Sequence, residues 1–175
     1  MPKLKDRLTT RGAETYFLSP DPTDHEAKAL ADVENEGAAP ESRPADAVSG
    51  ILADLALGQA RNDSAALAQA IQRHMVRDAG VPSRGVRQAP FVVLSGTKMP
   101  SALVEIGFIS HPREGRMLGG KNYQGKVAQA LADGVRDFAD KVLARRLVAQ
   151  VRSPAEKPDG VPVNAASVAS PGGTR

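Results

Sequence analysis

The chain has 175 residues, of which 41% are hydrophobic, so it is long enough to form one domain with a buried core. Only 3% of the residues are aromatic and cysteine is absent, which excludes disulfides and thiolate metal sites and leaves His, Asp and Glu as the only metal ligands. The net charge of +3 comes from 23 basic and 20 acidic residues that are interspersed, which argues against nucleic-acid binding.

The N-terminal sequence MPKLKDRLTT is basic and is not followed by an apolar segment, so we identify no signal peptide in this chain. We expect residues 1–10 to be disordered. No apolar stretch approaches the ~20 residues that a membrane span needs.

The segment AETYFLS (13–19) predicts a β-strand that ends in the turn sequence PDPTD. Thr23 and Glu26 have the spacing of a capping box, which predicts a helix that starts there and ends near Gly37. We interpret residues 36–46, which contain two prolines, as a connector.

From Ala47 the apolar periodicity is helical, with a break at 58–63. One face carries Val48, Ile51, Leu52, Leu55, Leu67, Ile71 and Met75. Residues 79–88 (AGVPSRGVRQ) are interpreted as a loop, and APFVVLSG (89–96) predicts a short apolar strand.

The segment SALVEIGFIS (101–110) predicts a buried strand. His111 as N-cap, followed by Pro112 and Glu114, predicts a short helix. A long amphipathic helix is expected over 122–147, with Tyr123, Val127, Leu131, Val135, Phe138 and Val142 on its buried side. We expect residues 149–175, which are rich in Pro, Gly, Ser and Ala, to be a disordered tail.

Strands that alternate with helices predict the α/β class, with a mixed sheet flanked by helices. Three strands are visible in the sequence, which is few for a sheet of this class.

Glu105 is the residue that fits its surroundings least, because it lies in the middle of an apolar strand. If the side chains alternate, Leu103, Glu105 and Gly107 share one face of the sheet. Burying an ionised carboxylate costs several kcal/mol, roughly, unless it is paired or its pKa rises. Two interpretations stay open: an ion pair with a basic side chain, or a general acid or base. Gly107 beside it suits either a ligand or a close backbone approach.

The three histidines give no metal motif. His25, His74 and His111 are scattered, and none forms an HExxH pair. We interpret each as a surface or capping residue. Glu34 shares a helix face with apolar residues, which is a weak indication of a structural or site role.

Five segments, in this order, resemble the zinc-dependent N-acetylmuramoyl-L-alanine amidases from about Arg11 to Ala144. They are RGAETYFLS, DHEAKALADVEN, ILADLA, APFVVLSGTKMPSALVEIGFISHPRE and YQGKVAQALADGV. These enzymes cleave the amide between the lactyl group of muramic acid and the first alanine of the stem peptide. In the family the glutamate of the LVEIGF strand is catalytic, so the resemblance implies that Glu105 is the general base that activates a Zn²⁺-bound water.

The resemblance also implies a zinc site formed by two histidines and a glutamate upstream of RGAETYFLS. The ten residues before Arg11 contain neither histidine nor glutamate, so we identify no metal ligands. We therefore expect residues 11–148 to be the C-terminal part of an amidase-type three-layer domain that lacks its first strands. We expect little zinc binding and negligible hydrolysis from this chain alone.

Two functions follow from the resemblance. The first is a peptidoglycan hydrolase with Glu105 as its catalytic residue, located in the cell envelope or outside the cell. The alternative is a catalytically inactive fragment that binds peptidoglycan or a partner protein. An incomplete sheet would also expose an edge through which the chain could self-associate.

Overall fold

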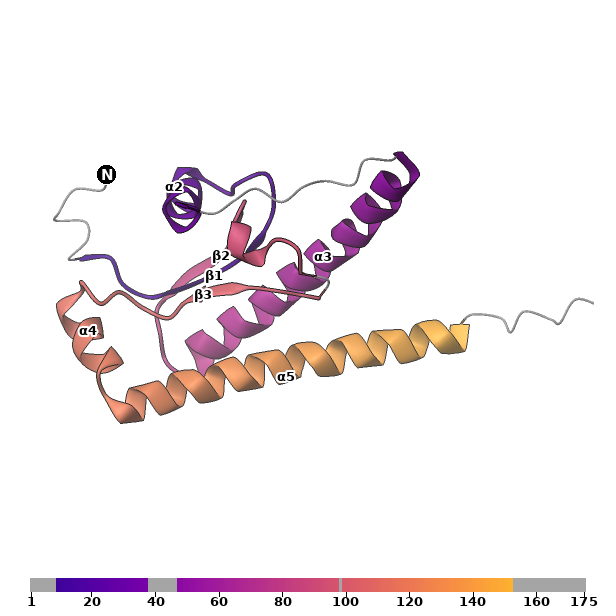
Figure 1. The fold of residues 1–175 in the computed structure, drawn as a ribbon. Coiled ribbons are helices and arrows are strands. Elements are labelled where there is room, and N and C mark those ends of the chain that lie inside the picture. The colour runs from indigo at the N-terminus through magenta and orange to yellow at the C-terminus, as the bar shows by residue number, and fades with distance from the viewer. Residues whose placement is uncertain (1–8, 38–46, 98, 153–175) are drawn as a thin grey trace, which may run out of the picture.

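A computed structural model describes residues 9–37, 47–97 and 99–152 of the chain (Figure 1). These residues form three layers, with a small sheet between one short helix and two long ones. The α/β class predicted from the sequence is confirmed. Most of the predicted connector and almost all of the predicted disordered termini lie outside the described residues.

The sheet has three strands in the order β2-β1-β3. The central strand β1 (Ala13–Leu18) pairs in parallel with β2 (Ser83–Ala89) and antiparallel with β3 (Leu103–Glu105), so the sheet is mixed, as predicted. Gly12, which precedes β1, has φ +109°, and a Cβ there would lie 2.4 Å from the carbonyl oxygen of Pro82. Only glycine lets the two chain segments approach so closely.

Two strand predictions are wrong. The segment interpreted as a loop at 79–88 contains most of β2, and the predicted strand at 89–96 is instead a 3₁₀ turn, η1 (Val92–Leu94). Pro90 has no N–H to donate to a sheet. Asn35 also holds this turn, because its side chain donates to the Pro90 carbonyl at 2.7 Å and accepts from the Val92 N–H at 2.8 Å.

Helix α2 (His25–Glu34) covers one face of the sheet. Its N-cap is Asp24, which accepts from the Ala27 N–H at 2.8 Å, so the prediction that Thr23 caps the helix is wrong by one residue. Thr23 accepts from the Gln88 N–H instead and ties the turn to β2. A core cluster joins this helix to the sheet and contains Tyr16, Ala27, Ala31, Ala89, Phe91 and Leu94.

The opposite face is covered by α3 (Ala47–Arg77), and α5 (Lys121–Arg152) packs along α3 (Figure 1). Helix α3 is continuous, so the predicted break at 58–63 is wrong. The buried cluster between these elements contains Leu67, Ile71, Met75, Val127 and Ala130, which confirms the predicted faces at Leu67, Ile71, Met75 and Val127. Val135 is an exception, because it is 49% exposed. The face predicted for α3 also includes Val48, Ile51, Leu52 and Leu55, whose side chains lie outside the part that the structure describes.

Helix α4 (Pro112–Leu118) begins as predicted. The His111 Nδ1 accepts from the backbone N–H groups of Arg113 and Glu114, and Pro112 is the first helical residue, where its missing N–H costs nothing.

In the described part of the chain, every helix is too short or too polar to cross a bilayer. Strands β2 and β3 each have an outer edge that pairs with no other described strand. Self-association through such an edge stays a prediction.

Candidate active site

Glu105 is the last residue of β3 and lies directly opposite Glu14 of β1. The predicted alternation is confirmed from Leu103 to Ile106: Leu103 packs against the α2 side of the sheet, whereas Val104 and Ile106 pack against the α3 side. Glu105 therefore points toward α2.

The carboxylate of Glu105 is half-buried, and burial raises its pKa above the ordinary value. Arg84 opposes this shift, and Glu34 and Glu26 add to it. No described residue forms a hydrogen bond or an ion pair with this carboxylate. Of the two interpretations left open by the sequence, the directly paired carboxylate is therefore not observed among the described residues.

Glu14, the cross-strand neighbour of Glu105, has hydrogen-bond partners on both carboxylate oxygens. It is 1% exposed, and its two oxygens accept from the Arg84 Nε and the Tyr16 hydroxyl. The Arg87 Nε lies 3.5 Å from the same carboxylate. Both carboxylate oxygens of Glu14 are thus engaged, whereas the Glu105 carboxylate has no hydrogen-bond or ion-pair partner among the described residues.

The two arginines of β2 link the sheet to the start of α2. Arg84 donates through Nη2 to Glu26 at 2.6 Å, and Arg87 donates through Nη1 to the other oxygen of Glu26 at 2.9 Å. Tyr16 lies beneath this network. Burial, with a further contribution from Glu105, raises the pKa of the Tyr16 phenol, which keeps it protonated as a donor.

Gly107 does not border open space. Its φ is +148°, and a Cβ there would lie 3.3 Å from Oε2 of Glu114. Glu114 is buried and accepts from the backbone N–H groups of Gly12 and Phe108, at 2.7 and 2.9 Å. Of the two roles considered for Gly107, the close approach is the one observed. It lets Glu114 bind both the segment before β1 and the segment after β3, the strand that carries Glu105.

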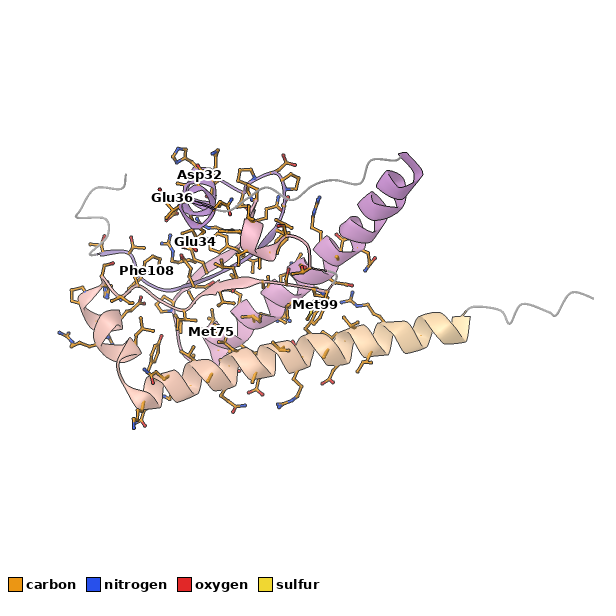
Figure 2. All side chains as sticks on the ribbon, viewed as in Figure 1. Asp32, Glu34, Glu36, Met75, Met99 and Phe108 are labelled. Carbon is orange, nitrogen blue, oxygen red and sulfur yellow. The ribbon has the colours of Figure 1, made fainter. Side chains whose placement is uncertain are left out.

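The structure separates the histidines from Glu105. His25 starts α2 and is exposed, His111 caps α4, and His74 is buried on the α3 side of the sheet. Glu34 ends α2 and lies on the side of the helix that faces the sheet (Figure 2). It is exposed, and its charge raises the pKa of Glu105; a role for Glu34 in the site stays a prediction.

The donor set around Glu105 does not fit a zinc site. In the described part of the chain, the charged groups that act on Glu105 are carboxylates and arginines, without a histidine. The one group of three possible ligands among the described residues is His74, Asp78 and Asp133, between α3 and α5. Arg77 and Arg136 already pair with its two carboxylates, and it lies on the other side of the sheet from Glu105.

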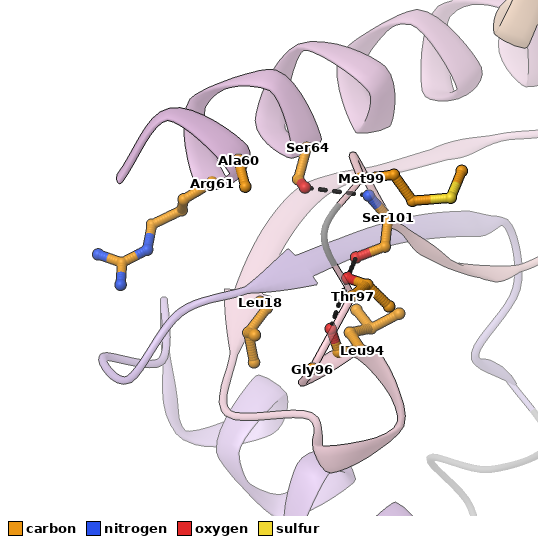
Figure 3. Close-up of a pocket in the computed structure, with 9 residues that line it drawn as sticks. All are labelled: Leu18, Ala60, Arg61, Ser64, Leu94, Gly96, Thr97, Met99 and Ser101. Atoms are coloured by element: carbon orange, nitrogen blue, oxygen red, sulfur yellow. Dashed lines mark hydrogen bonds between the residues drawn. The ribbon is translucent and has the colours of Figure 1, made fainter. Parts of the chain in front are cut away.

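A small pocket of about 40 Å³ lies at the carboxyl end of β1, away from Glu105 (Figure 3). Leu18, Leu94 and Met99 supply apolar lining, and the Ser64 hydroxyl accepts from the Ser101 N–H at 3.0 Å. A space of this volume holds about one water molecule.

Arg84, Arg87 and Glu14 are not predicted from the sequence as site residues. A signal for Glu14 was present, since it is a charged residue in an apolar strand just as Glu105 is. The arginines gave none, because β2 was interpreted as a loop.

Fold and site together define an α/β protein with a half-buried carboxylate, Glu105, at the end of a strand, where no described residue pairs with it. The chain belongs to the N-acetylmuramoyl-L-alanine amidase family, whose model matches residues 3–137.

Relatives and solved structures that are similar to this chain include two amidases and one amidase catalytic domain. The chain is 46% identical over 56 residues to the N-acetylmuramoyl-L-alanine amidase AmiA of Escherichia coli, covering 32% of this chain and 19% of that one. It is 29% identical over 150 residues to the N-acetylmuramoyl-L-alanine amidase AmiC of Neisseria meningitidis, and the match covers 79% of this chain and 34% of AmiC. The solved structure of the catalytic domain of the amidase CwlV from Bacillus (Paenibacillus) polymyxa matches with a TM-score of 0.49 at 23% identity. The match covers 75% of this chain and 50% of the CwlV chain. The chain thus spans half or less of the length of each.

Proposed function

We propose that this chain takes part in peptidoglycan hydrolysis as an N-acetylmuramoyl-L-alanine amidase, with Glu105 as the general base. The observation that carries the proposal is the half-buried Glu105 carboxylate, which has no hydrogen-bond or ion-pair partner among the described residues. Burial brings the pKa of such a group closer to neutral pH, where proton transfer in both directions is efficient. Family membership supplies the substrate class.

In the proposed reaction, Glu105 takes a proton from the water that attacks the lactyl carbonyl carbon. The new C–O bond forms, the C–N bond breaks, and Glu105 returns the proton to the departing nitrogen of L-alanine. The products are the lactyl carboxylic acid and the free amine of the stem peptide. Glu14 cannot replace Glu105 in this role, because Arg84 and Tyr16 occupy its oxygens.

A direct test uses the 175-residue chain with purified peptidoglycan sacculi, and mass spectrometry to detect cleavage of the lactyl–alanine amide, with and without added zinc. Loss of a general base lowers the rate by about 10²–10⁴-fold, so Glu105→Gln should lower cleavage by at least about 100-fold. Glu36→Gln is the matched control, since Glu36 is exposed. Equal cleavage by Glu105→Gln and the unmodified chain would remove Glu105 from the mechanism.

A second candidate is a binding module that holds peptidoglycan without cleaving it. It is favoured by one observation: no zinc ligand set lies beside Glu105 in the described part of the chain. Co-sedimentation with sacculi separates the two functions, because binding with no amide cleavage, even with zinc added, supports the module. Either function implies a location in the cell envelope or outside the cell.

A further inference from the structure

Arg84 lies where it can control the charge of Glu105. The register of β1 with β2 shifts between Ala13 and Glu14, which pair with Ser83 and Gly85 and leave Arg84 as an extra residue. Such a bulge redirects the side chain of the extra residue. Gly85 follows with φ +97°, a conformation that favours glycine.

From this bulge the Arg84 side chain crosses the face of the sheet. Its Nε donates to Glu14 of the central strand, and its guanidinium carbon lies 5.4 Å from the centre of the Phe108 ring, three residues beyond Glu105. A cation in this position is attracted by the face of the ring. Arg84 therefore reaches from β2 across Glu14 of the central strand to Phe108, which follows the β3 strand that carries Glu105.

The same side chain is fixed at several points. Only 21% of it is exposed, and Nε and Nη2 are engaged by Glu14 and Glu26. No described residue accepts from Nη1. The guanidinium is thus a positive charge held in place by Glu14 and Glu26, and it forms no direct ion pair with Glu105.

We infer that Arg84 is a positioning residue for Glu105. Its guanidinium is anchored on Glu14 and is the fixed counter-charge that keeps the Glu105 carboxylate ionised, although the Glu14 carboxylate lies opposite it on the neighbouring strand. This inference rests on the proposed function of Glu105. Without Arg84, Glu14 and Glu105 would be like charges opposite each other on one sheet face, with Cβ atoms about 4.5–5.5 Å apart.

The remaining charges agree with this role. Among the groups that lower the pKa of Glu105, Arg84 has the largest effect, and Arg87 has a smaller one. The groups that face Glu105 are, on β1, Glu14 and Tyr16; on β2, Arg84 and Arg87; and on α2, Glu26 and Glu34.

The test is a titration of the Glu105 carboxyl carbon by NMR, assigned by its loss in Glu105→Gln. In Arg84→Gln the midpoint should move to higher pH, and by more than in Arg87→Gln. Arg84→Lys keeps the charge and should leave the midpoint close to that of the unmodified chain. Arg136→Gln, which changes an exposed arginine on α5, should have no effect. An unchanged midpoint in folded Arg84→Gln would overturn the inference.

Removing Arg84 alone leaves Glu14 buried without its main partner, so this variant could unfold. The pair Glu14→Gln and Glu14→Gln/Arg84→Gln avoids the problem, because neither leaves the buried carboxylate. The double variant should have the higher Glu105 midpoint, and equal midpoints would overturn the inference. Since the titration needs no turnover, it separates this inference from the proposed function. If the chain cleaves peptidoglycan, the acidic limb of its kcat/KM profile should shift to higher pH in Arg84→Gln.

Discussion

Gly134 of α5 lies against the backbone of Ile71 in α3. A Cβ at residue 134 would lie 2.8 Å from the Ile71 Cα and 3.1 Å from its nitrogen. Both atoms belong to a helix backbone, which cannot move aside as a flexible side chain can. The two long helices of this layer therefore approach each other closely at a position where one of them has no side chain.

Replacing Gly134 with alanine should destabilise the protein by about 1–3 kcal/mol, because overpacking a buried contact forces the backbones apart. This loss should exceed the gain of about 1 kcal/mol that alanine brings to a helix. Urea unfolding followed by circular dichroism measures the difference.

Gly125 provides the matched control in the same helix. A Cβ there meets nothing within 4 Å, so Gly125→Ala should stabilise the protein by up to about 1 kcal/mol. If both alanine variants shifted the unfolding midpoint in the same direction, the close contact between α3 and α5 would be contradicted.

Glu114→Ala should be one of the more damaging single changes in the chain. It removes the acceptor of the Gly12 and Phe108 N–H groups, and buried donors without partners cost about 1–3 kcal/mol each. Because these bonds hold the segment after β3, the NMR signals of residues 105–108 should also shift. Glu36→Ala, at an exposed glutamate, should change neither quantity by a measurable amount.

The N-cap of α4 allows a conservative test. His111→Ala removes the acceptor for two N–H groups and should cost about 1 kcal/mol, whereas His111→Asn keeps a good capping oxygen and should cost a few tenths at most. Thermal melting of the two variants side by side distinguishes a capping histidine from one with another role, for which both changes would be equally harmful.

The sequence predicted best those features that depend on neighbouring residues. The start of α4 follows from His111, Pro112 and Glu114 alone, and the apolar period of α5 follows from its own residues. Glu105 was singled out because a charge in an apolar strand is visible without a structure.

Strand β2 shows why the rest could not be predicted. Its apolar alternation is interrupted by Arg84 and Arg87, so it was interpreted as a loop. Arg84 pairs with Glu14, which lies 70 residues earlier in the chain, and Arg87 pairs with Glu26, which lies 61 residues earlier. A strand whose polar residues are paired only in the folded protein carries no local signal. The charges that act on Glu105 also come from residues distant in the sequence, such as Glu26, so only the structure shows them.

Glu105 itself should lower the stability of the protein at neutral pH. Burial raises its pKa in the folded state above the ordinary value of 4.5, so the folded protein binds more protons than the unfolded chain between the two values. Stability is therefore lost as the pH rises from about 4.5 through the folded-state pKa, and the penalty is constant above it. Glu105→Gln removes this penalty and should unfold at a higher urea concentration than the unmodified chain at pH 7.

The advantage of Glu105→Gln should shrink as the pH falls and disappear below 4.5, where Glu105 is protonated in both states. Glu36→Gln should show no such dependence, because Glu36 is exposed. A Glu105→Gln variant less stable than the unmodified chain at pH 7 would mean that the carboxylate has a stabilising partner in the folded protein. That result would remove the unpaired carboxylate on which the proposed acid–base role depends, because an ion pair lowers the pKa of a carboxyl group and makes the carboxylate a weaker base.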